Sequence, residues 1–324
     1  MKKYKLGSLF AGIGGIDLGF ELAGVESVWA NEIDQSCAIT FNENHRNTRL
    51  LVEDINKVTS KDIPHIDILG GGFPCQPFSV AGHLKGFEDD RGGLFFQITR
   101  LIKEMDFEGR KPQVIFLENV KNLYTHDEGK TYSKMRELLS ELGYFVVAKI
   151  LNSCEYGNVP QNRERLFIIA FADKTAGERF GWPEKITLTN GIDKLIDWKS
   201  EKVPAKYFYT SDSKCFPLLD SEMKHNHSIY QFRRVYVREN KSKLCPTLTA
   251  NMGMGGHNVP LIKDNEGQIR KLMPRECLRM QGFPDSFVIP KSLADSKIYK
   301  QAGNSVSVSV IERIAKNILV ALNG

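Results

Sequence analysis

The first half of this chain alternates short apolar runs with longer amphipathic segments. The short runs predict strands and the longer segments predict helices. Strands that alternate with helices pack into a mostly parallel, doubly wound α/β sheet. The predicted strands are 4–10, 27–30, 66–70, 114–117, 145–151 and 166–170, and the predicted helices are one that ends at Gly24 and those at 35–42, 95–105 and 132–142.

The character of the sequence changes after about Ala172. Residues 173–270 are polar, basic and rich in turns, without clear helical periodicity. This pattern predicts a second, smaller domain that is irregular and partly β. Within it, 182–206 is expected to be loosely ordered, and 230–237 is interpreted as one strand with a slipped alternation. Helices are predicted again at 274–281 and 306–322.

Composition excludes some classes of protein. The six cysteines contain no C-x-x-C pair, so a structural zinc site is not expected. No run of about 18 apolar residues occurs, so no membrane span is predicted. The net charge of +5 is compatible with a polyanionic partner, and equally with a solvated basic face. A chain of 324 residues needs no disulfides for stability, which fits a reducing cytoplasm.

A glycine-rich turn follows the first predicted strand and favours a ligand site. Glycines let the backbone turn tightly and approach a ligand, although a plain strand-to-helix turn is an alternative interpretation. Glu32 follows the second strand, where Rossmann-like sheets bind ribose hydroxyls, and Asp54 follows a third apolar stretch, 50–52. Together these residues indicate adenosine, without deciding between NAD and S-adenosylmethionine. The turn consists of Phe10, Ala11, Gly12, Ile13, Gly14 and Gly15.

A cysteine between two prolines follows the predicted strand 66–70. Free cysteines are usually buried, but the glycines before Cys75 and the polar loop after it favour the ligand edge of the sheet. Glu118 and Asn119 end the next strand, on the same edge. Arg163 and Arg165 are two residues apart, so in an extended chain they share one face. Such a pair suits a carboxylate, a phosphate or an oxygen that gains negative charge, or forms a surface cluster with the glutamate between them.

The motifs FAGIGG, NEID, GGFPCQPFS, LENV, QNRERLFIIA and QAGNSVSVSVIERIA, in this order and spacing, resemble those of the DNA (cytosine-5)-methyltransferases. The resemblance covers nearly the whole chain. It implies a Rossmann-like, S-adenosylmethionine-dependent domain made of 1–180 and 296–324, discontinuous in sequence. It also implies a target recognition domain at 181–295, where the sequence is irregular.

The resemblance implies a mechanism as well as a fold. Cys75 would attack carbon 6 of a cytosine flipped out of duplex DNA, which makes carbon 5 nucleophilic. Glu118, in the motif that also carries Asn119, would hold or protonate N3. Arg165, with Arg163, would bind O2 and help to keep the thiolate ionised. No side chain identifies itself as the base that removes the proton from carbon 5.

The resemblance also assigns the cofactor site. The cofactor would be S-adenosylmethionine, with S-adenosylhomocysteine as product and no metal. Phe10 and Ile33 would sandwich the adenine, and Glu32 would accept from the ribose hydroxyls. Residues 79–93 match the mobile active-site loop of the family. The remaining lining residues are Asp54 and Ile55 at the adenine edge, Pro74 and Leu94, the turn Ala11, Gly12, Ile13, Gly14 and Gly15, and Asn304, Ser305 and Val306 from the C-terminal segment.

A basic segment lies in the predicted recognition domain. Residues 224–243 carry six basic residues and one acidic residue, interleaved with aromatic residues, which suits a DNA face or a solvated strand. Arginines there can bind guanine edges or contact phosphates, which carry no sequence information. The segment Thr-Leu-Thr-Ala that follows resembles the recognition signature of the family. The candidate DNA contacts are Ser79, Arg233, Arg234, Thr247, Thr249, Asn251, Gly255, Gly256 and His257.

Three other functions are alternatives for a sequence of this kind. An RNA cytosine-5 methyltransferase would share the catalytic core. A zinc cytidine deaminase needs P-C-x-x-C, and the segment around Cys75 lacks the second cysteine. A non-enzymatic DNA-binding regulator needs no nucleophile. We expect a cytoplasmic modification enzyme of a prokaryote or phage, because the chain is compact without a regulatory extension. We expect it to be monomeric on duplex DNA, with a restriction endonuclease as a candidate partner. The recognised site is undetermined; a short CG-rich one is the weak expectation.

Overall fold

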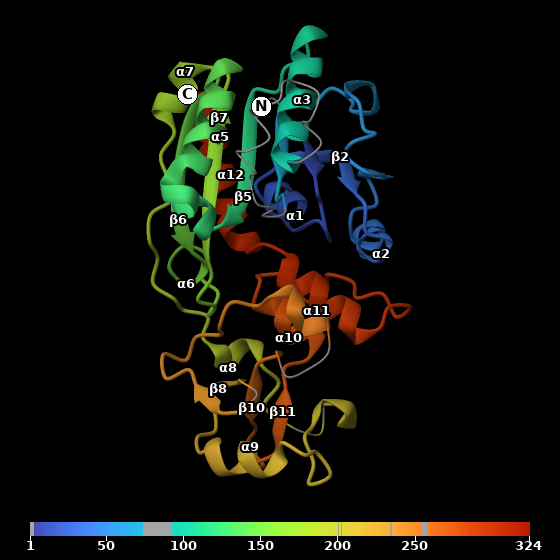
Figure 1. Cartoon of the computed structure of the whole chain (residues 1–324), viewed down its shortest axis with the longest axis vertical. Coiled ribbons are helices and arrows are strands. Elements are labelled where there is room, and N and C mark those ends of the chain that lie inside the picture. The colour runs from blue at the N-terminus through green and yellow to red at the C-terminus, as the bar shows by residue number, and fades with distance from the viewer. Residues whose placement is uncertain (1–2, 74–92, 200, 202, 234, 255–257) are drawn as a thin grey trace. The chain divides into compact units, whose positions relative to one another are not determined.

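The computed structural model describes residues 3–73, 93–199, 201, 203–233, 235–254 and 258–324, in two compact units (Figure 1). The first unit comprises Met1–Leu151, Glu164–Pro183 and Ile311–Gly324, and the second comprises Asn152–Arg163 and Glu184–Val310. The structure thus groups 152–163 and 296–310 with the second unit, whereas the sequence interpretation placed them in the first domain. The functional domains themselves stay a prediction.

A seven-stranded sheet forms the centre of the first unit, in the order β3-β2-β1-β4-β5-β7-β6. Neighbours from β3 to β5 pair in parallel, and β7 pairs antiparallel to β5. The predicted mostly parallel α/β sheet is therefore confirmed. Its strands are β1 (Lys5–Leu9), β2 (Glu26–Glu32), β3 (Arg49–Val52), β4 (Ile68–Gly71), β5 (Val114–Val120), β6 (Phe145–Asn152) and β7 (Glu164–Phe171).

Helices cover both faces of this sheet because successive side chains of a strand point to opposite sides. In β5, Ile115 and Leu117 pack in one core with residues of α3 and α5, while the ring of Phe116 lies edge-on to Phe20 of α1. No helix within the described ranges is both long and apolar enough to cross a bilayer. The helices are α1 (Gly15–Leu22), α2 (Gln35–Asn44), η1 (Ser60–Asp62), α3 (Leu94–Phe107), α4 (Asn122–Thr125), η4 (His126–Gly129), α5 (Lys130–Glu141), α7 (Lys174–Arg179) and α12 (Val308–Asn323).

The second unit contains a four-stranded antiparallel sheet in the order β11-β10-β8-β9. Tyr230, Leu261 and Ile269 from this sheet pack on Leu219 and Met223 in a small apolar core. The predicted smaller, partly β region is confirmed. Its elements are α6 (Ser153–Tyr156), α8 (Ile192–Leu195), η6 (Ala205–Tyr207), α9 (Phe216–Glu222), β8 (Ile229–Phe232), β9 (Val237–Glu239), η7 (Ala250–Gly253), β10 (Leu261–Lys263), β11 (Ile269–Lys271), α10 (Pro274–Arg279) and α11 (Asp295–Asn304).

Three sequence-based expectations for residues 173–270 differ from the structure. The single strand 230–237 is a hairpin of β8 and β9, in which the amide of Arg233 donates to the carbonyl of Tyr236 at 2.8 Å. The break in the alternation of apolar and polar residues marks the turn between these two strands. Residues 173–270 also contain α7, α8 and α9, which are four to seven residues long and therefore too short to show a helical period. The segment 182–206, expected to be loosely ordered, includes α8 and the buried Trp198.

Two glycines allow close packing in the second unit. A Cβ built on Gly253 of η7 would lie 2.2 Å from the carbonyl oxygen of Ser296, and one on Gly303 of α11 would lie 2.1 Å from the carbonyl carbon of Thr249. Real Cβ atoms do not approach so closely, so only glycine permits this contact of α11 with η7. Helix α11 was not predicted from the sequence.

Candidate active site and cofactor site

The predicted site residues of the first unit lie where parallel strands end. The glycine-rich turn follows β1, Glu32 ends β2, Asp54 follows β3, and Glu118 lies near the end of β5. Because β3, β2, β1, β4 and β5 pair in parallel, their carboxyl ends share one edge of the sheet. Ligands of open α/β sheets bind outside this edge. The structure thus brings these predicted residues to the same edge.

The glycine-rich turn depends on backbone conformations that favour glycine. Gly12 and Gly14 have φ values of 58° and 83°, and Phe10 has the left-handed φ of 54°, which strains a residue with a side chain. A Cβ on Gly14 would lie 2.1 Å from Nε2 of His45. A Cβ on Gly12 would meet no atom of the described residues within 4 Å, so they leave that side of the turn open. The turn is therefore packed against His45 at Gly14, whereas at Gly12 the described residues leave space.

The carboxylate of Glu32 is held by backbone amides. Its Oε2 accepts from the amide of Gly12 at 2.8 Å, and its Oε1 accepts from the amides of Ile33 at 2.9 Å and Asp34 at 2.8 Å. A carboxylate has about four acceptor positions, so these three donors, counted among the described residues, leave one for a hydroxyl of a ligand. The neighbouring Ile33 side chain is 64% exposed, which leaves an apolar surface beside the open turn.

The segment after β3 is tied to β2 and folded into a turn. The amide of Asn31 donates from Nδ2 to the carbonyls of Leu51 at 3.1 Å and Glu53 at 2.8 Å. Oδ1 of Asp54 accepts from the backbone amide and Nδ2 of Asn56, at 2.9 and 2.8 Å. Next to Asp54, Ile55 is buried. The turn therefore presents the Asp54 carboxylate at the ligand edge.

A buried polar network lies beneath the glycine-rich turn, and sequence reasoning missed it. Oδ1 of Asp17 accepts from the hydroxyls of Ser8 at 2.8 Å and Ser27 at 2.7 Å. Burial raises the pKa of the Asp17 carboxyl. Burial lowers the pKa of His45, but the hydrogen bond to Glu21 and the charge of Asp17 outweigh it, so that pKa is raised overall. A serine in each of two strands and an acid in the following helix are too common to reveal the network in the sequence.

Glu118 and Arg165 form an ion pair across β5 and β7. Nε of Arg165 lies 3.1 Å from Oε1 of Glu118, and the two side chains are only 15% and 10% exposed. A Cβ on Gly72, just after β4, would lie 3.6 Å from Oε2 of Glu118. Cys75 follows Gly72 by three positions in the chain. The structure thus brings two of the predicted catalytic side chains together next to the strand that leads to the third.

Asn119 anchors the segment before the predicted nucleophile. Its Nδ2 donates to the carbonyl of Phe73 at 2.9 Å in a buried hydrogen bond, while its Oδ1 accepts from the amide of Val120 at 2.8 Å. Leu94, the first residue of α3, is half-buried against the core. The predicted site residues that lie outside the described ranges are Pro74, Cys75, Ser79, Arg234, Gly255, Gly256 and His257.

Arg163 has a different environment from Arg165. It precedes β7 and is 2% exposed in the second unit, where its guanidinium donates to the carbonyls of Leu248 at 2.8 Å, Gly303 at 3.3 Å and Ser305. Arg165 instead contacts Glu118. The two guanidinium groups therefore have different partners, although the sequence suggested that they act at one point.

The other predicted residues of the second unit differ in exposure. Ser305 and Val306 are buried, whereas Asn304 is exposed. The hydroxyl of Thr247 donates to the carbonyl of Asn162 at 2.6 Å, so it has an internal partner. The side chains exposed to solvent are those of Arg233, Thr249 and Asn251.

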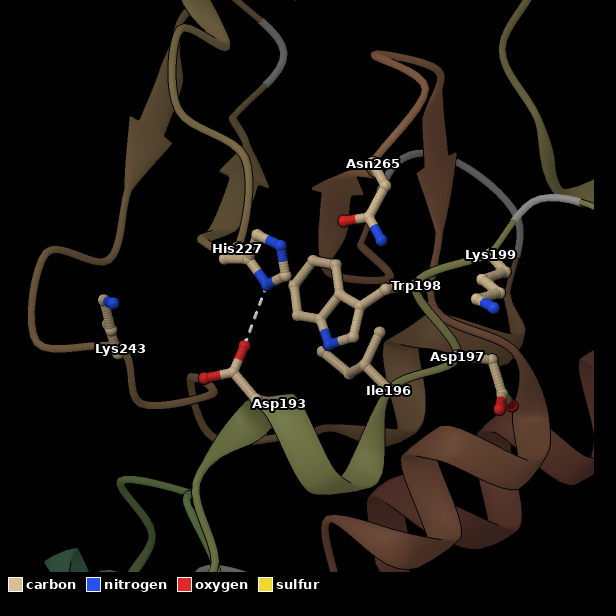
Figure 2. Close-up of a pocket in the computed structure, with 8 residues that line it drawn as sticks. All are labelled: Asp193, Ile196, Asp197, Trp198, Lys199, His227, Lys243 and Asn265. Carbon is tan, nitrogen blue, oxygen red and sulfur yellow. Dashed lines mark hydrogen bonds and ion pairs between the residues drawn. The ribbon is translucent and has the colours of Figure 1, made fainter.

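A cavity of about 490 Å³ lies in the second unit, and none of the predicted site residues within the described ranges lines it. Figure 2 shows that the imidazole of His227 faces both Trp198 and Asp193. The rings of His227 and Trp198 have centroids 4.6 Å apart, and Nδ1 of His227 lies 3.0 Å from Oδ1 of Asp193. Trp198 is only 8% exposed, so its ring is not free to stack with a base. The predicted site residues at the sheet edge therefore have no part in this cavity as the structure describes it.

Comparison with known proteins identifies the family and the fold. The model of the C-5 cytosine-specific DNA methylase family matches residues 4–320. Type II methyltransferase M.Bsp6I of Bacillus sp. (strain RFL6) is 51% identical over 318 residues, which cover 97% of this chain and 98% of that protein. Type II methyltransferase M.HhaI of Haemophilus parahaemolyticus is 37% identical over 330 residues, covering 97% of this chain and 94% of that protein.

Among solved structures, the S. pombe Dnmt2 methyltransferase superposes with a TM-score of 0.74 at 20% identity, over 100% of both chains, which shows a shared fold. The chain belongs to the C-5 cytosine-specific DNA methylase family. It is, accordingly, a DNA (cytosine-5)-methyltransferase.

Proposed function

We propose that this enzyme methylates carbon 5 of a cytosine flipped out of a specific duplex DNA site, through a covalent bond between Cys75 and carbon 6. The observation that carries the proposal is the ion pair of Glu118 and Arg165, 3.1 Å apart and mostly shielded from solvent, beside the strand that leads to Cys75. A carboxyl and a guanidinium at this place suit N3 and O2 of one cytosine ring.

The residues at the sheet edge fit S-adenosylmethionine. We infer that Glu32 uses its remaining acceptor position for the ribose hydroxyls and that Ile33 and Phe10 cover the adenine. Asp54 and Ile55 would bind the adenine edge, and the turn Ala11–Gly15 would line the methionine part. When bound, S-adenosylmethionine supplies a methyl group on a sulfonium, whose sulfur keeps the bonding electron pair. Pro74, Leu94, Asn304, Ser305 and Val306 stay proposed lining residues.

The protein side chains would activate the ring in sequence. The thiolate of Cys75 forms a bond to carbon 6, and the π pair of the carbon 5–carbon 6 bond becomes available at carbon 5. Glu118 keeps a proton at N3 and Arg165 donates to O2, which stabilises the added charge. After carbon 5 has bonded to the methyl group, it loses its proton to a base that is not assigned. The double bond re-forms as Cys75 leaves as a thiolate.

Arg163 and Asn119 would act through the backbone. The buried hydrogen bonds of Arg163 join the segments at Leu248 and at 303–305 in the second unit. Asn119 holds the carbonyl of Phe73, two residues before Cys75. We therefore propose that both are positioning residues and that Arg165 alone of the two arginines contacts O2.

Sequence recognition would belong to exposed residues of the second unit. Arg233 lies in the turn between β8 and β9, together with Val235 and Tyr236, which are 80% and 54% exposed. Exposed apolar side chains beside an arginine suit contact with bases as well as phosphates. Sequence reasoning missed Val235 because it assigned this turn to a strand. The other candidate DNA contacts are Ser79, Arg234, Thr247, Thr249, Asn251, Gly255, Gly256 and His257.

The relatives are named type II methyltransferases, which favours a modification enzyme that protects DNA from a restriction endonuclease of the same specificity. We propose the same role here. A monomeric state on DNA and a cytoplasmic location remain part of this proposal.

The first test is methyl transfer from labelled S-adenosylmethionine to mixed genomic DNA, followed by bisulfite sequencing. We expect 5-methylcytosine in one short motif with the native protein and none with Cys75→Ser. Absence of methylation with the native protein would contradict the proposal and favour an RNA substrate or a regulatory role.

A second test addresses the covalent step. An oligonucleotide with 5-fluorocytosine in the identified motif cannot lose a proton from carbon 5, so Cys75 should stay bonded to it. We expect a protein–DNA adduct that survives denaturing electrophoresis and requires S-adenosylmethionine. Cys75→Ser is the matched control, and an adduct of equal yield with this variant would exclude Cys75 as the nucleophile.

A further inference from the structure

Arg100, on α3, holds the turn that follows Asp54. One of its terminal nitrogens, Nη2, donates to the carbonyls of Ile55 at 3.1 Å and Val58 at 2.7 Å. Its Nε donates to Oε1 of Gln97 at 2.7 Å, and Nη1 donates to Oε1 of Glu104 at 2.6 Å. The guanidinium is therefore oriented from its own helix by two side chains while it binds two carbonyls of the turn.

The turn held in this way carries the proposed adenine edge. The amide of Lys57 donates to the carbonyl of Asp54 at 2.9 Å, and the amide of Val58 donates to the carbonyl of Ile55 at 3.3 Å. The Asp54 carboxylate is fixed on the same turn by Asn56. A shift of the Ile55 and Val58 carbonyls would therefore move the Asp54 side chain and the Ile55 backbone together.

A second arginine holds the same connection farther along. Arg110 donates to the carbonyls of Ser60 and Ile63, each at 2.9 Å, and forms an ion pair with Glu108. Glu108 in turn accepts from the hydroxyl of Ser60 at 2.6 Å. Both arginines thus bind carbonyls between β3 and β4, but Arg110 does so at least six residues from Asp54.

We propose that Arg100 is a positioning residue for the cofactor, which sets the position of the turn Asp54–Val58 and thereby of the groups that read the adenine edge. This inference rests on the proposed function. Arginine suits this role because its planar fork spreads several donors over separate acceptors. Lysine has one nitrogen and cannot reach the two carbonyls, Gln97 and Glu104 together. The segment Asp54–Val58 alone does not reveal this residue, since the contact forms only when α3 packs on the turn.

The experiment compares Arg100→Lys with Arg110→Lys by calorimetric binding of S-adenosylhomocysteine, together with thermal unfolding of both variants. Both substitutions remove hydrogen bonds to the same connection, so we expect similar decreases in Tm. Only Arg100→Lys should weaken binding, by about tenfold in Kd, or ~1.4 kcal/mol. A Kd within about twofold of native for Arg100→Lys, or an equal loss in Arg110→Lys, would overturn the inference.

A second ligand separates positioning from a general loss of stability. S-inosylhomocysteine carries a carbonyl in place of the exocyclic amine, so an acceptor at Asp54 should discriminate against it. We expect the native protein and Arg110→Lys to prefer S-adenosylhomocysteine, and Arg100→Lys to lose most of this preference. In steady-state methylation, Arg100→Lys should raise KM for S-adenosylmethionine while kcat stays nearly native.

The outcomes separate this inference from the function on which it depends. If the native protein binds neither nucleoside, the proposed cofactor site fails and Arg100 has nothing to position. If the native protein binds and discriminates but Arg100→Lys discriminates equally well, only the role of Arg100 is refuted. In a double-mutant cycle with Asp54→Asn, the two losses should be less than additive in free energy, because both act on one contact.

Discussion

The edge of the large sheet and the exposed part of the second unit differ in how their candidate side chains are held. At the sheet edge the candidate side chains are fixed: Glu32 by three backbone amides, Asn119 by a buried carbonyl, and Glu118 by Arg165. In the second unit the candidate DNA contacts Arg233 and Asn251 lie exposed. Fixed groups suit chemistry, where geometry must be set before the substrate binds, and exposed groups suit recognition of varied surfaces.

The second unit nevertheless has a rigid centre. Arg270 and Glu276 form a fully buried ion pair, with Nη2 of the arginine 2.7 Å from Oε1 of the glutamate. Glu276 also accepts from the amides of Asp197 at 2.8 Å and Met273 at 2.6 Å. We call the Arg270–Glu276 pair and the backbone that it binds the frame of the second unit. The two regions therefore differ more in the exposure of their candidate side chains than in the order of their backbone.

The largest expected effect comes from breaking that frame. Glu276→Gln would leave the buried guanidinium of Arg270 without its counter-charge, a change that typically destabilises by about 3–5 kcal/mol. We expect a strong decrease in Tm and in the denaturant midpoint. Glu312→Gln, which removes a partly exposed pair with Lys316, is the control and should change stability by less than about 1 kcal/mol. Equal effects would mean that burial does not determine the strength of the frame.

The next largest effect is on catalysis at the sheet edge. Glu118→Gln keeps the size and shape of the side chain but removes the carboxyl group that would supply a proton at N3. We expect kcat to fall by about 10²–10³, a typical loss for one general acid or charge-stabilising group. Binding of S-adenosylhomocysteine should stay within about twofold of native, since Glu118 is not a proposed cofactor ligand. Rapid-quench methylation and calorimetry measure the two quantities. A native kcat would remove Glu118 from the mechanism.

A smaller effect is expected from the glycine-rich turn. Gly14→Ala places a Cβ where His45 lies and imposes a left-handed φ of 83° on alanine. We expect the Kd for S-adenosylhomocysteine to rise by about 10- to 100-fold, equal to ~1.4–2.7 kcal/mol. Gly24→Ala is a matched control, because its φ is 95° but a Cβ there meets no described atom within 4 Å. If both substitutions weaken binding alike, backbone strain and not the contact with His45 is responsible.

A pH dependence is expected from the network below this turn. Because the folded-state pKa of His45 is raised above 6.5, its stabilising contribution is complete below that pH and is lost as pH rises through the folded-state pKa. The raised pKa of Asp17 also lowers the stability as pH rises, because burial disfavours the ionised form in the folded state above pH 3.8. We expect the native Tm to decrease above about pH 6.5 and His45→Gln to flatten this decrease. Thermal unfolding at several pH values checks this, with His65→Gln at an exposed position as the control variant.

The smallest effects are expected in the exposed turn of the second unit. If Arg233 contacts only phosphate, Arg233→Ala should weaken binding to all DNA sequences alike. It should also reduce the slope of log K against log salt concentration by about 1. If it reads a guanine, the loss should be about 1–3 kcal/mol and specific to one position of the site. Competition binding with single-substituted duplexes at several salt concentrations distinguishes the two. Unchanged binding of every duplex would exclude Arg233 from the interface.

Much of this protein follows from local sequence. The alternation of apolar runs with amphipathic segments predicted the sheet, because strand and helix periods are properties of short segments. The turn Phe10–Gly15 and the acids Glu32 and Asp54 could be placed at one edge, since the carboxyl ends of parallel strands coincide. The family followed from motifs in which the order of residues is itself the signal.

Other features were decided by tertiary structure. The sequence could not show that Arg163 would be buried against Leu248 and Ser305, or that Arg100 would hold the turn after Asp54, because each contact joins residues 42 or more positions apart. The hairpin of β8 and β9 was mistaken for one strand, since a tight turn and a slipped alternation look alike over eight residues. Periodicity reports which face of an element is apolar, whereas the partner of a charged side chain depends on which distant backbone the fold brings to it.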